Sequence, residues 1–191
     1  MRKIKEILKK VAEYLNERNI DYVVVGGLAV FFHGTPRSTM DIDFLMKVDK
    51  NDIKSLVSFL KENDFFASER DFNLALKEES HCSMIDRESS LRLDIKGIYD
   101  KRDRKTLENK VSVNFEGTKI NIASPEDTVV NKLLFGSEQD IKDAKSIIIR
   151  QEDLDEEYIK KLTKEIGVLE DYKSLKRDVK ESLRKYTKGD Y

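Results

Sequence analysis

The segment from Tyr22 to Phe44 constrains the fold more than any other part of the chain. It begins with the apolar run Tyr22–Val25, and a short β-branched run of this kind is typical of a buried strand. The glycine pair Gly26 and Gly27 ends the run, and an apolar segment and a polar turn follow. The segment closes on alternating acidic and apolar residues, which predicts a second strand.

Two acids in this second strand form a candidate metal site. Residues two apart in a strand point to the same face, so Asp41 and Asp43 should project together while Ile42 faces the other way. Two carboxylates held this close repel each other unless positive charge lies between them. A divalent cation supplies that charge, and Mg²⁺ prefers hard oxygen ligands of this type.

The glycine pair predicts a site for an anion. A strand that breaks at Gly26 and Gly27 and enters a helix leaves backbone N–H groups unpaired at the helix start. Those groups and the helix dipole favour a phosphate, and glycine lets the phosphate approach the backbone closely. Together with the carboxylates, this pattern indicates chemistry on a metal-bound nucleotide.

With these residues in view, the segment resembles the signature of the polymerase-β-like nucleotidyltransferases, a glycine pair followed after a spacer by Asp-x-Asp. Thirteen residues, 28 to 40, separate the glycine pair from the first acid. The fuller pattern is similar to the small prokaryotic branch that includes abortive-infection (AbiEii-type) toxin nucleotidyltransferases. Its fixed positions are Gly26, Gly27, Ala29, His33, Gly34, Arg37, Thr39, Asp41, Ile42, Asp43 and Phe44.

The resemblance implies roles for these residues. Asp41 and Asp43 would hold two Mg²⁺ or Mn²⁺ ions, and a nucleoside triphosphate such as ATP would be the substrate. The nucleotide-binding residues would be Gly26, Gly27, Arg37, Thr39, His33 and Lys132. The forked donors of arginine suit a phosphate.

The family has a third carboxylate on a neighbouring strand, and two acids could supply it. In the segment from Leu91 to Gly97, Leu91, Leu93 and Ile95 share one face, whereas Arg92, Asp94 and Lys96 share the other. Asp94 is the preferred third catalytic and metal-binding carboxylate. Asp86 is the alternative.

The resemblance also points to a later pair of helices. It places a lysine on one helix and an acid-x-x-acid motif on the next near the active site. Lys132, Asp140 and Asp143 fit this arrangement, and the two acids should share a helix face. The arginine expected just before Asp140 is replaced by Gln139.

Composition bounds the class of protein. Charged residues make up 38% of the 191 residues, yet the net charge is −1, so no overall field attracts nucleic acid. A single cysteine, Cys82, rules out an internal disulfide and suits a reducing compartment. No apolar run approaches the length of a membrane span, and the charged N-terminus is unlike a signal peptide. These features predict a cytoplasmic protein with no membrane partner.

The patterns predict an α+β fold, a mixed sheet with helices followed by a C-terminal helical segment. Residues 1–123 should form the nucleotidyltransferase-like core, and residues 124–191 should pack on it. Helices are expected over 2–18, 28–32, 49–62, 125–135, 138–150, 155–166 and from 172 onward, with a hairpin around Glu116 and Gly117. Residues 65–100 should form strands with polar interruptions, and residues 101–108 a charged loop.

The predicted function is metal-dependent transfer of a nucleoside monophosphate to a hydroxyl acceptor. The acceptor could be a tRNA end, a protein or a small molecule, and the enzyme could be toxin-like with a cognate antitoxin as partner. One alternative is an inactive nucleotide-binding or partner-binding protein of the same fold. A non-enzymatic RNA-binding module is another, although the near-neutral charge disfavours it.

Overall fold

The computed structural model describes residues 4–188, and the side chains of these residues through 184. Within this range the chain forms a seven-stranded mixed sheet and nine helices, which confirms the α+β prediction. The strands are β1 (Tyr22–Val25), β2 (Asp41–Met46), β3 (Phe65–Phe66), β4 (His81–Asp86), β5 (Arg92–Lys96), β6 (Val111–Phe115) and β7 (Thr118–Ile122). The helices are α1 (Ile4–Glu17), α2 (Gly26–His33), α3 (Lys50–Glu62), α4 (Glu69–Lys77), α5 (Lys101–Glu108), α6 (Pro125–Phe135), α7 (Glu138–Arg150), α8 (Glu156–Glu165) and α9 (Leu169–Lys188).

The described chain divides into two compact units. The first comprises the residues up to Leu28 together with Ser38–Ala123, and it contains the sheet. The second comprises Ala29–Arg37 together with the residues from Ser124 onward. The division after Ala123 falls where the sequence changes from strands to helices, while the packing of one unit on the other stays a prediction.

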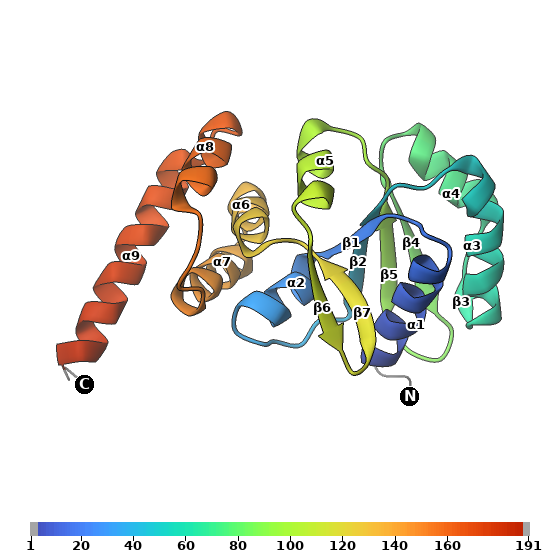
Figure 1. The fold of residues 1–191 in the computed structure, drawn as a ribbon, viewed down its shortest axis with the longest axis horizontal. Helices are drawn as coiled ribbons and strands as arrows, with labels where there is room; N and C mark the ends of the chain where they lie inside the picture. The colour runs from blue at the N-terminus through green and yellow to red at the C-terminus, as the bar shows by residue number, and fades with distance from the viewer. Residues whose placement is uncertain (1–3, 189–191) are drawn as a thin grey trace. The chain divides into compact units, whose positions relative to one another are not determined.

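The sheet of the first unit has the strand order β3-β4-β5-β2-β1-β7-β6 (Figure 1). Strand β2 lies at its centre, antiparallel to β1 and parallel to β5. Strand β7 is parallel to β1, and the β6–β7 hairpin turns at Glu116 and Gly117, as predicted. Both turn residues have positive φ, +47° and +86°, which suits a tight hairpin turn.

The two faces of the sheet differ in burial around the acids of β2 and β5. On one face every side chain of the central strands is buried, including Ile42 and Phe44 of β2 and Leu93 and Ile95 of β5. Helix α1 packs against β7, and its Tyr14 stacks on Phe59 of α3, so these helices are neighbours over the first unit. The alternation of burial leaves the acids of β2 and β5 on the opposite face.

Two helices in the first unit correct the sequence prediction. Helix α4 replaces the strand expected around residues 69–77, and its N-terminus is capped by Ser68, whose side chain accepts from the backbone N–H of Asp71. Helix α5 replaces the loop expected at 101–108, and Asp100 caps it in the same way. Both are short, and α5 carries few apolar residues, so the apolar pattern alone did not distinguish them from strand or loop and their capping residues were the remaining signal.

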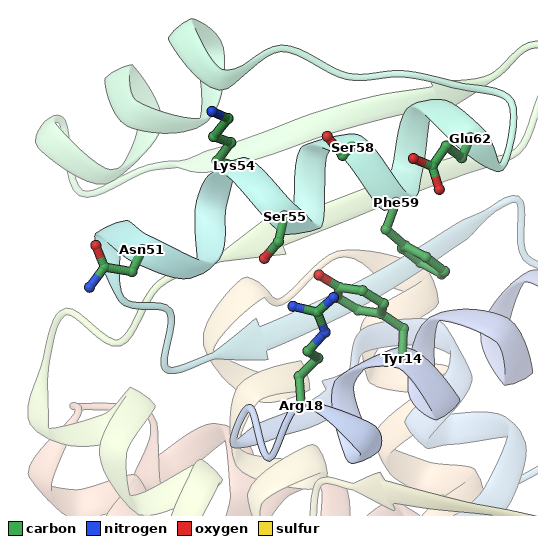
Figure 2. A pocket seen from close by; sticks show the side chains of 8 residues that line it. All are labelled: Tyr14, Arg18, Asn51, Lys54, Ser55, Ser58, Phe59 and Glu62. Atoms are coloured by element: carbon green, nitrogen blue, oxygen red, sulfur yellow. The ribbon is translucent and has the colours of Figure 1, made fainter.

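An open groove lies between α1 and α3 (Figure 2). It has a cavity volume of about 580 Å³ and is lined by Tyr14, Arg18, Asn51, Lys54, Ser55, Ser58, Phe59 and Glu62. The Arg18 guanidinium lies over the Tyr14 ring, 5.2 Å from its centroid. None of the predicted site residues lines this groove.

The second unit is a helical cluster with its own apolar core. Helix α6 packs on α7 and α8, and α9 packs on α7 and α8. The core includes Val129, Leu133, Ile147, Ile159 and Tyr172, together with Val30 from α2. In the part of the chain that the structure describes, no helix is long and apolar enough to cross a membrane.

Candidate active site

The three predicted carboxylates lie on one face of the central strands. Asp43 of β2 is paired directly with Asp94 of β5, and Asp41 pairs with Arg92. Asp41 and Asp43 are two residues apart in β2, so both point to the face that carries Asp94. All three are partly exposed, whereas the residues between them are buried. The strand register thus brings the three acids together.

The alternative third acid, Asp86, lies on the opposite face. Burial alternates along β4, and Asp86 falls in the buried set with Cys82 and Met84. Its carboxylate accepts a hydrogen bond from the Ser89 hydroxyl. Asp94, not Asp86, therefore shares a face with Asp41 and Asp43.

The absence of a side chain at Gly26 leaves room for the Asp43 carboxylate. It begins α2 with φ +65°, in the left-handed region that favours glycine. A Cβ added at this position would lie 2.1 Å from Asp43 Oδ2 and 2.9 Å from Asp43 Cγ. The strand-to-helix turn thus packs its bare backbone directly against one carboxylate of the group.

The electrostatics of this face suit a cation. Asp94 Oδ1 is buried and has no hydrogen-bond partner, one of three such side-chain atoms in the described residues. A buried, unpaired carboxylate oxygen is costly unless a cation or another donor compensates it. The carboxylate oxygens on this face, one of them without a partner, are the type of ligand that a hard divalent cation prefers.

Asp41 forms an ion pair with Arg92, a residue that the sequence analysis did not assign to the site. Arg92 Nε donates to Asp41 Oδ1 at 2.7 Å, and this bond raises the pKa of the guanidinium. Among the described residues, no group of three or more His, Cys, Asp and Glu side chains is arranged so that it could hold a metal ion. The carboxylates of this face therefore match a divalent cation in the type of their donor atoms, and not in a preformed coordination geometry. The signal for Arg92 was present in the sequence, because it lies two residues before Asp94 and shares its face.

Thr39 contacts the backbone at the start of β2. Its hydroxyl lies 3.3 Å from both the N–H and the carbonyl oxygen of Asp41. This contact fixes the entry of the chain into the strand that carries the two acids. The predicted contact of Thr39 with a nucleotide stays a prediction.

The second unit contains an ion cluster formed by four predicted residues. Arg37 binds the Asp143 carboxylate with two parallel bonds of 2.9 Å, from Nε and Nη2. Lys132 Nζ lies 2.7 Å from Asp140 Oδ1 and 2.9 Å from Asp143 Oδ2. Asp143 is only 3% exposed, so this is a buried charge held by two cations.

Gln139 replaces the arginine expected before Asp140, and the structure gives it a role. Its Nε2 donates to Asp143 Oδ1 at 2.8 Å. The cation that the resemblance places next to the acid-x-x-acid motif comes instead from Arg37, which is distant in the sequence. Asp140 also accepts from Ser137, which caps α7.

The hydrogen bonds in this cluster determine the pKa of both acids. Burial alone would raise the pKa of Asp143, but bonds from Arg37, Gln139 and Lys132 outweigh it and lower the pKa. Burial likewise opposes a lowered pKa at Asp140, where bonds from Lys132 and Ser137 prevail. Both acids are therefore ionised at neutral pH.

This cluster should make the stability of the second unit depend on pH. Both carboxylates have a lower pKa in the folded state than in the unfolded chain, so their stabilisation is present above about pH 4. It should be lost as the pH falls through their folded pKa values. Asp143→Asn should cost about 3 kcal/mol at pH 7, because it removes the buried carboxylate that pairs with both Arg37 and Lys132. Urea unfolding followed by circular dichroism at pH 7 and pH 3 measures both effects.

The difference between wild type and Asp143→Asn should shrink at pH 3, where the wild-type carboxylate begins to accept a proton. Lys142→Gln is the matched control, since Lys142 forms an exposed pair with Glu138 on the same helix. A constant difference between wild type and Asp143→Asn across this range would contradict the assignment.

The remaining residues of the motif hold the chain to α7. A Cβ on Gly34 would lie 2.3 Å from Ser146 Oγ and 3.0 Å from Ile147 Cγ1. The backbone carbonyl of His33 accepts from Gln151 Nε2, and its side chain is buried. His33, Gly34 and Arg37 thus each contact α7 or the residue that follows it. The predicted binding of nucleotide by His33, Arg37 and Lys132 stays a prediction.

Comparison with solved structures supports the fold. An antigenic nucleotidyltransferase-like protein from Paracoccidioides brasiliensis matches with a TM-score of 0.53 and 22% identity, covering 75% of this chain and 73% of that one. The antibiotic-resistance factor ANT(2")-Ia, solved in complex with adenylyl-2"-tobramycin, matches with a TM-score of 0.59 and 11% identity, covering 85% of this chain and 96% of that one. At these identities the likeness shows the fold alone. A search of curated proteins gave no match.

The sequence was also compared with profiles of protein families. Residues 1–188 match the family described as "Nucleotidyltransferase of unknown function (DUF6036)". This match covers nearly the whole chain and agrees with the fold and with the glycine and carboxylate signature. The resemblance to polymerase-β-like nucleotidyltransferases is thereby confirmed, while the abortive-infection branch stays a prediction. The chain belongs to this family of nucleotidyltransferases.

Proposed function

We propose that the protein is a divalent-cation-dependent enzyme that transfers a nucleoside monophosphate from a nucleoside triphosphate to a hydroxyl group. The observation that carries this proposal is the register that pairs Asp43 with Asp94 and sets Asp41 beside them on one face. The family and the fold support nucleotidyl transfer in general. The carboxylates add the chemistry that such a transfer needs.

Asp41, Asp43 and Asp94 are the residues that would hold the metal, as Mg²⁺ or Mn²⁺. When bound, the ions would supply positive charge that offsets the triphosphate and lowers the pKa of the acceptor hydroxyl. Asp94 lies opposite Asp43 on the same face, and it is the carboxylate that would accept the hydroxyl proton. The acceptor oxygen then bonds to the α-phosphorus, and the bond from that phosphorus to the bridging oxygen breaks, releasing pyrophosphate.

Gly26 and Gly27 supply the phosphate side of the site. They begin α2, so their backbone N–H groups belong to the first turn of a helix, where an anion is stabilised. The contact between Gly26 and Asp43 sets this turn next to the carboxylates. The backbone N–H groups that would bind the phosphates and the carboxylates that would bind the metal are therefore neighbours within the first unit, as transfer from a triphosphate requires.

The acceptor and the biological role extend this proposal. ANT(2")-Ia was solved with an adenylylated antibiotic, which makes a small-molecule hydroxyl one candidate acceptor. An RNA end and a protein hydroxyl are the other candidates. A toxin role with a cognate antitoxin would follow from the abortive-infection resemblance.

The test is transfer of label from each α-³²P-labelled nucleoside triphosphate, with Mg²⁺ or Mn²⁺, into RNA, protein and small-molecule pools. Asp43→Asn is the blank. Label that enters one pool with wild type and is lost in the blank would support the proposal and identify the acceptor class. Equal labelling with the blank would refute the assignment of the carboxylates. Triphosphate binding without transfer into any pool would favour the inactive binder.

A further inference from the structure

A row of exposed side chains leads from the carboxylates to the edge of the sheet. The strand register aligns Asp41 of β2 with Arg92 of β5, Arg92 with Ile85 of β4, and Ile85 with Phe66 of β3. Residues aligned across adjacent strands point to the same face. The row therefore crosses four neighbouring strands, which Figure 1 shows within one sheet. We call Phe66, Ile85 and Arg92 the acceptor strip.

The side chains of the acceptor strip are exposed to solvent, and the described residues do not cover this part of the sheet face. Phe66 is 63% exposed and Ile85 is 49% exposed, and the Arg92 side chain is 51% exposed. Their sequence neighbours Phe65 and Leu93 are almost fully buried on the other face. Two large apolar side chains thus lie side by side in solvent, and a ligand that reaches the carboxylates along this row would cover them.

The chemistry of the strip selects the kind of ligand. Phe66 offers a flat aromatic face, and the Arg87 guanidinium lies 4.8 Å from its ring centroid. Exposed aromatic rings and guanidinium groups stack with unpaired bases, and arginine also binds phosphate. The two cations, Arg87 and Arg92, would repel a polycationic acceptor such as an aminoglycoside.

The length of the strip fits several nucleotides. Adjacent strands are about 4.8 Å apart, so the three steps from Asp41 to Phe66 span about 14 Å. Stacked nucleotides follow one another at about 3.4 Å. A few bases of a single strand can therefore lie along the strip while the terminal hydroxyl reaches the carboxylates.

Arg92 links the strip to the reaction. It pairs with Asp41 at 2.7 Å. A cation held by Asp41 would replace Arg92 as the positive partner of that carboxylate, which makes the guanidinium available to an acceptor phosphate. Arg92 is thus placed to bind the acceptor next to its reacting end.

We infer that the acceptor strip binds the single-stranded end of a nucleic acid and presents its terminal hydroxyl to Asp41, Asp43 and Asp94. This inference rests on the proposed function, because it names the acceptor class for the same site. It adds Phe66, Ile85 and Arg92 as acceptor-binding residues, none of which belongs to the signature.

The experiment measures binding of a fluorescein-labelled single-stranded RNA 12-mer, and of DNA with the same sequence, by anisotropy with the full chain and Mg²⁺. Phe66→Ala should weaken binding about tenfold, since one stacked base is lost. Arg92→Gln should weaken it several-fold and reduce the slope of log affinity against log salt by about one. Leu74→Ala, at a residue 47% exposed on α4, is the matched control and should leave binding unchanged.

Binding by wild type that Phe66→Ala and Arg92→Gln leave unchanged would overturn the inference, as would the absence of binding to either strand. Sedimentation of the same variants tests another occupant. A wild-type dimer that Phe66→Ala dissociates, without an effect on the oligonucleotide, would make the strip an interface between copies and would also overturn it. Equal loss of RNA and DNA binding supports a phosphate-and-stacking contact, and loss of RNA binding alone supports RNA.

The readout separates this inference from the proposed function. Oligonucleotide binding that depends on Phe66, with no transfer of label into any pool, would support the acceptor strip and refute the proposed transferase activity. Transfer of label into small molecules at a rate that Phe66→Ala does not alter would refute the acceptor strip and support the proposed transferase activity.

Discussion

Asp94→Asn should reduce nucleotidyl transfer on the order of 10³-fold while making the protein more stable. The carboxylate is expected to bind metal and accept the hydroxyl proton, and a neutral amide does neither well. Its Oδ1 is buried without a partner, and it lies directly opposite Asp43. Replacing the charge removes repulsion and allows the amide to donate to Asp43, which should raise Tm by about 2–4 °C. Transfer assays and thermal unfolding of the same preparation measure both effects.

Asp86→Asn is the matched control, since Asp86 was the other candidate for the third carboxylate. Its carboxylate accepts from Ser89 on the buried face. The substitution should cost about 1 kcal/mol of folding free energy and leave transfer nearly intact. The opposite pattern, with transfer lost in Asp86→Asn and kept in Asp94→Asn, would show that the third carboxylate is misassigned.

Gly26→Ala should reduce transfer about a hundredfold, because the new Cβ displaces the Asp43 carboxylate. The nearest atoms to that Cβ would be Asp43 Oδ2 and Cγ, at 2.1 and 2.9 Å. The end of this side chain can rotate away cheaply, so the clash should be relieved at the expense of the position of the carboxylate. A displacement of about 1 Å at a reacting group commonly costs this much in rate.

Gly117→Ala separates this effect from backbone strain. Both glycines have positive φ, +65° and +86°, so an alanine at either position should cost about 1–2 kcal/mol. A Cβ on Gly117 meets nothing within 4 Å, however, and it should leave transfer unchanged. Equal loss of transfer in the two variants would mean that strain, and not the contact with Asp43, limits the activity of Gly26→Ala.

The sequence predicted most of the first unit because its patterns are local. Alternation placed Asp41 and Asp43 on one face, and the same alternation in β5 singled out Asp94. Pairing of β2 with β5 is not local, since the strands are about fifty residues apart, and only the structure gives the register that sets Asp43 opposite Asp94. Arg92 was seen to share the face of Asp94, but its partner across the register could not be read from the chain.

The helical corrections have a related cause. Helices α4 and α5 both begin at a capping residue, and α5 is also held by the ion pair between Lys96 and Asp103. Helix α4 is nine residues long and buries only Phe72 and Ala75, which is too short a pattern to identify a helix in the sequence. Arg37 is a second case of a distant partner. The sequence analysis did not foresee its pairing with Asp143, more than a hundred residues later, while its predicted contact with a phosphate stays a prediction. Ion pairs of this kind depend on tertiary packing, which a linear pattern does not encode.

The division into units has a consequence for modular exchange of this protein. The chain passes between the units three times, after Leu28, after Arg37 and after Ala123. The nine-residue excursion from Ala29 to Arg37 contributes Val30 to the core of the helical unit, and Gly34 and Arg37 pack against α7. A cut after Ala123 would therefore strip this excursion of its core and leave a buried valine in water. A single recombination junction could therefore not exchange the helical unit as a whole, because two separate segments of the chain form it.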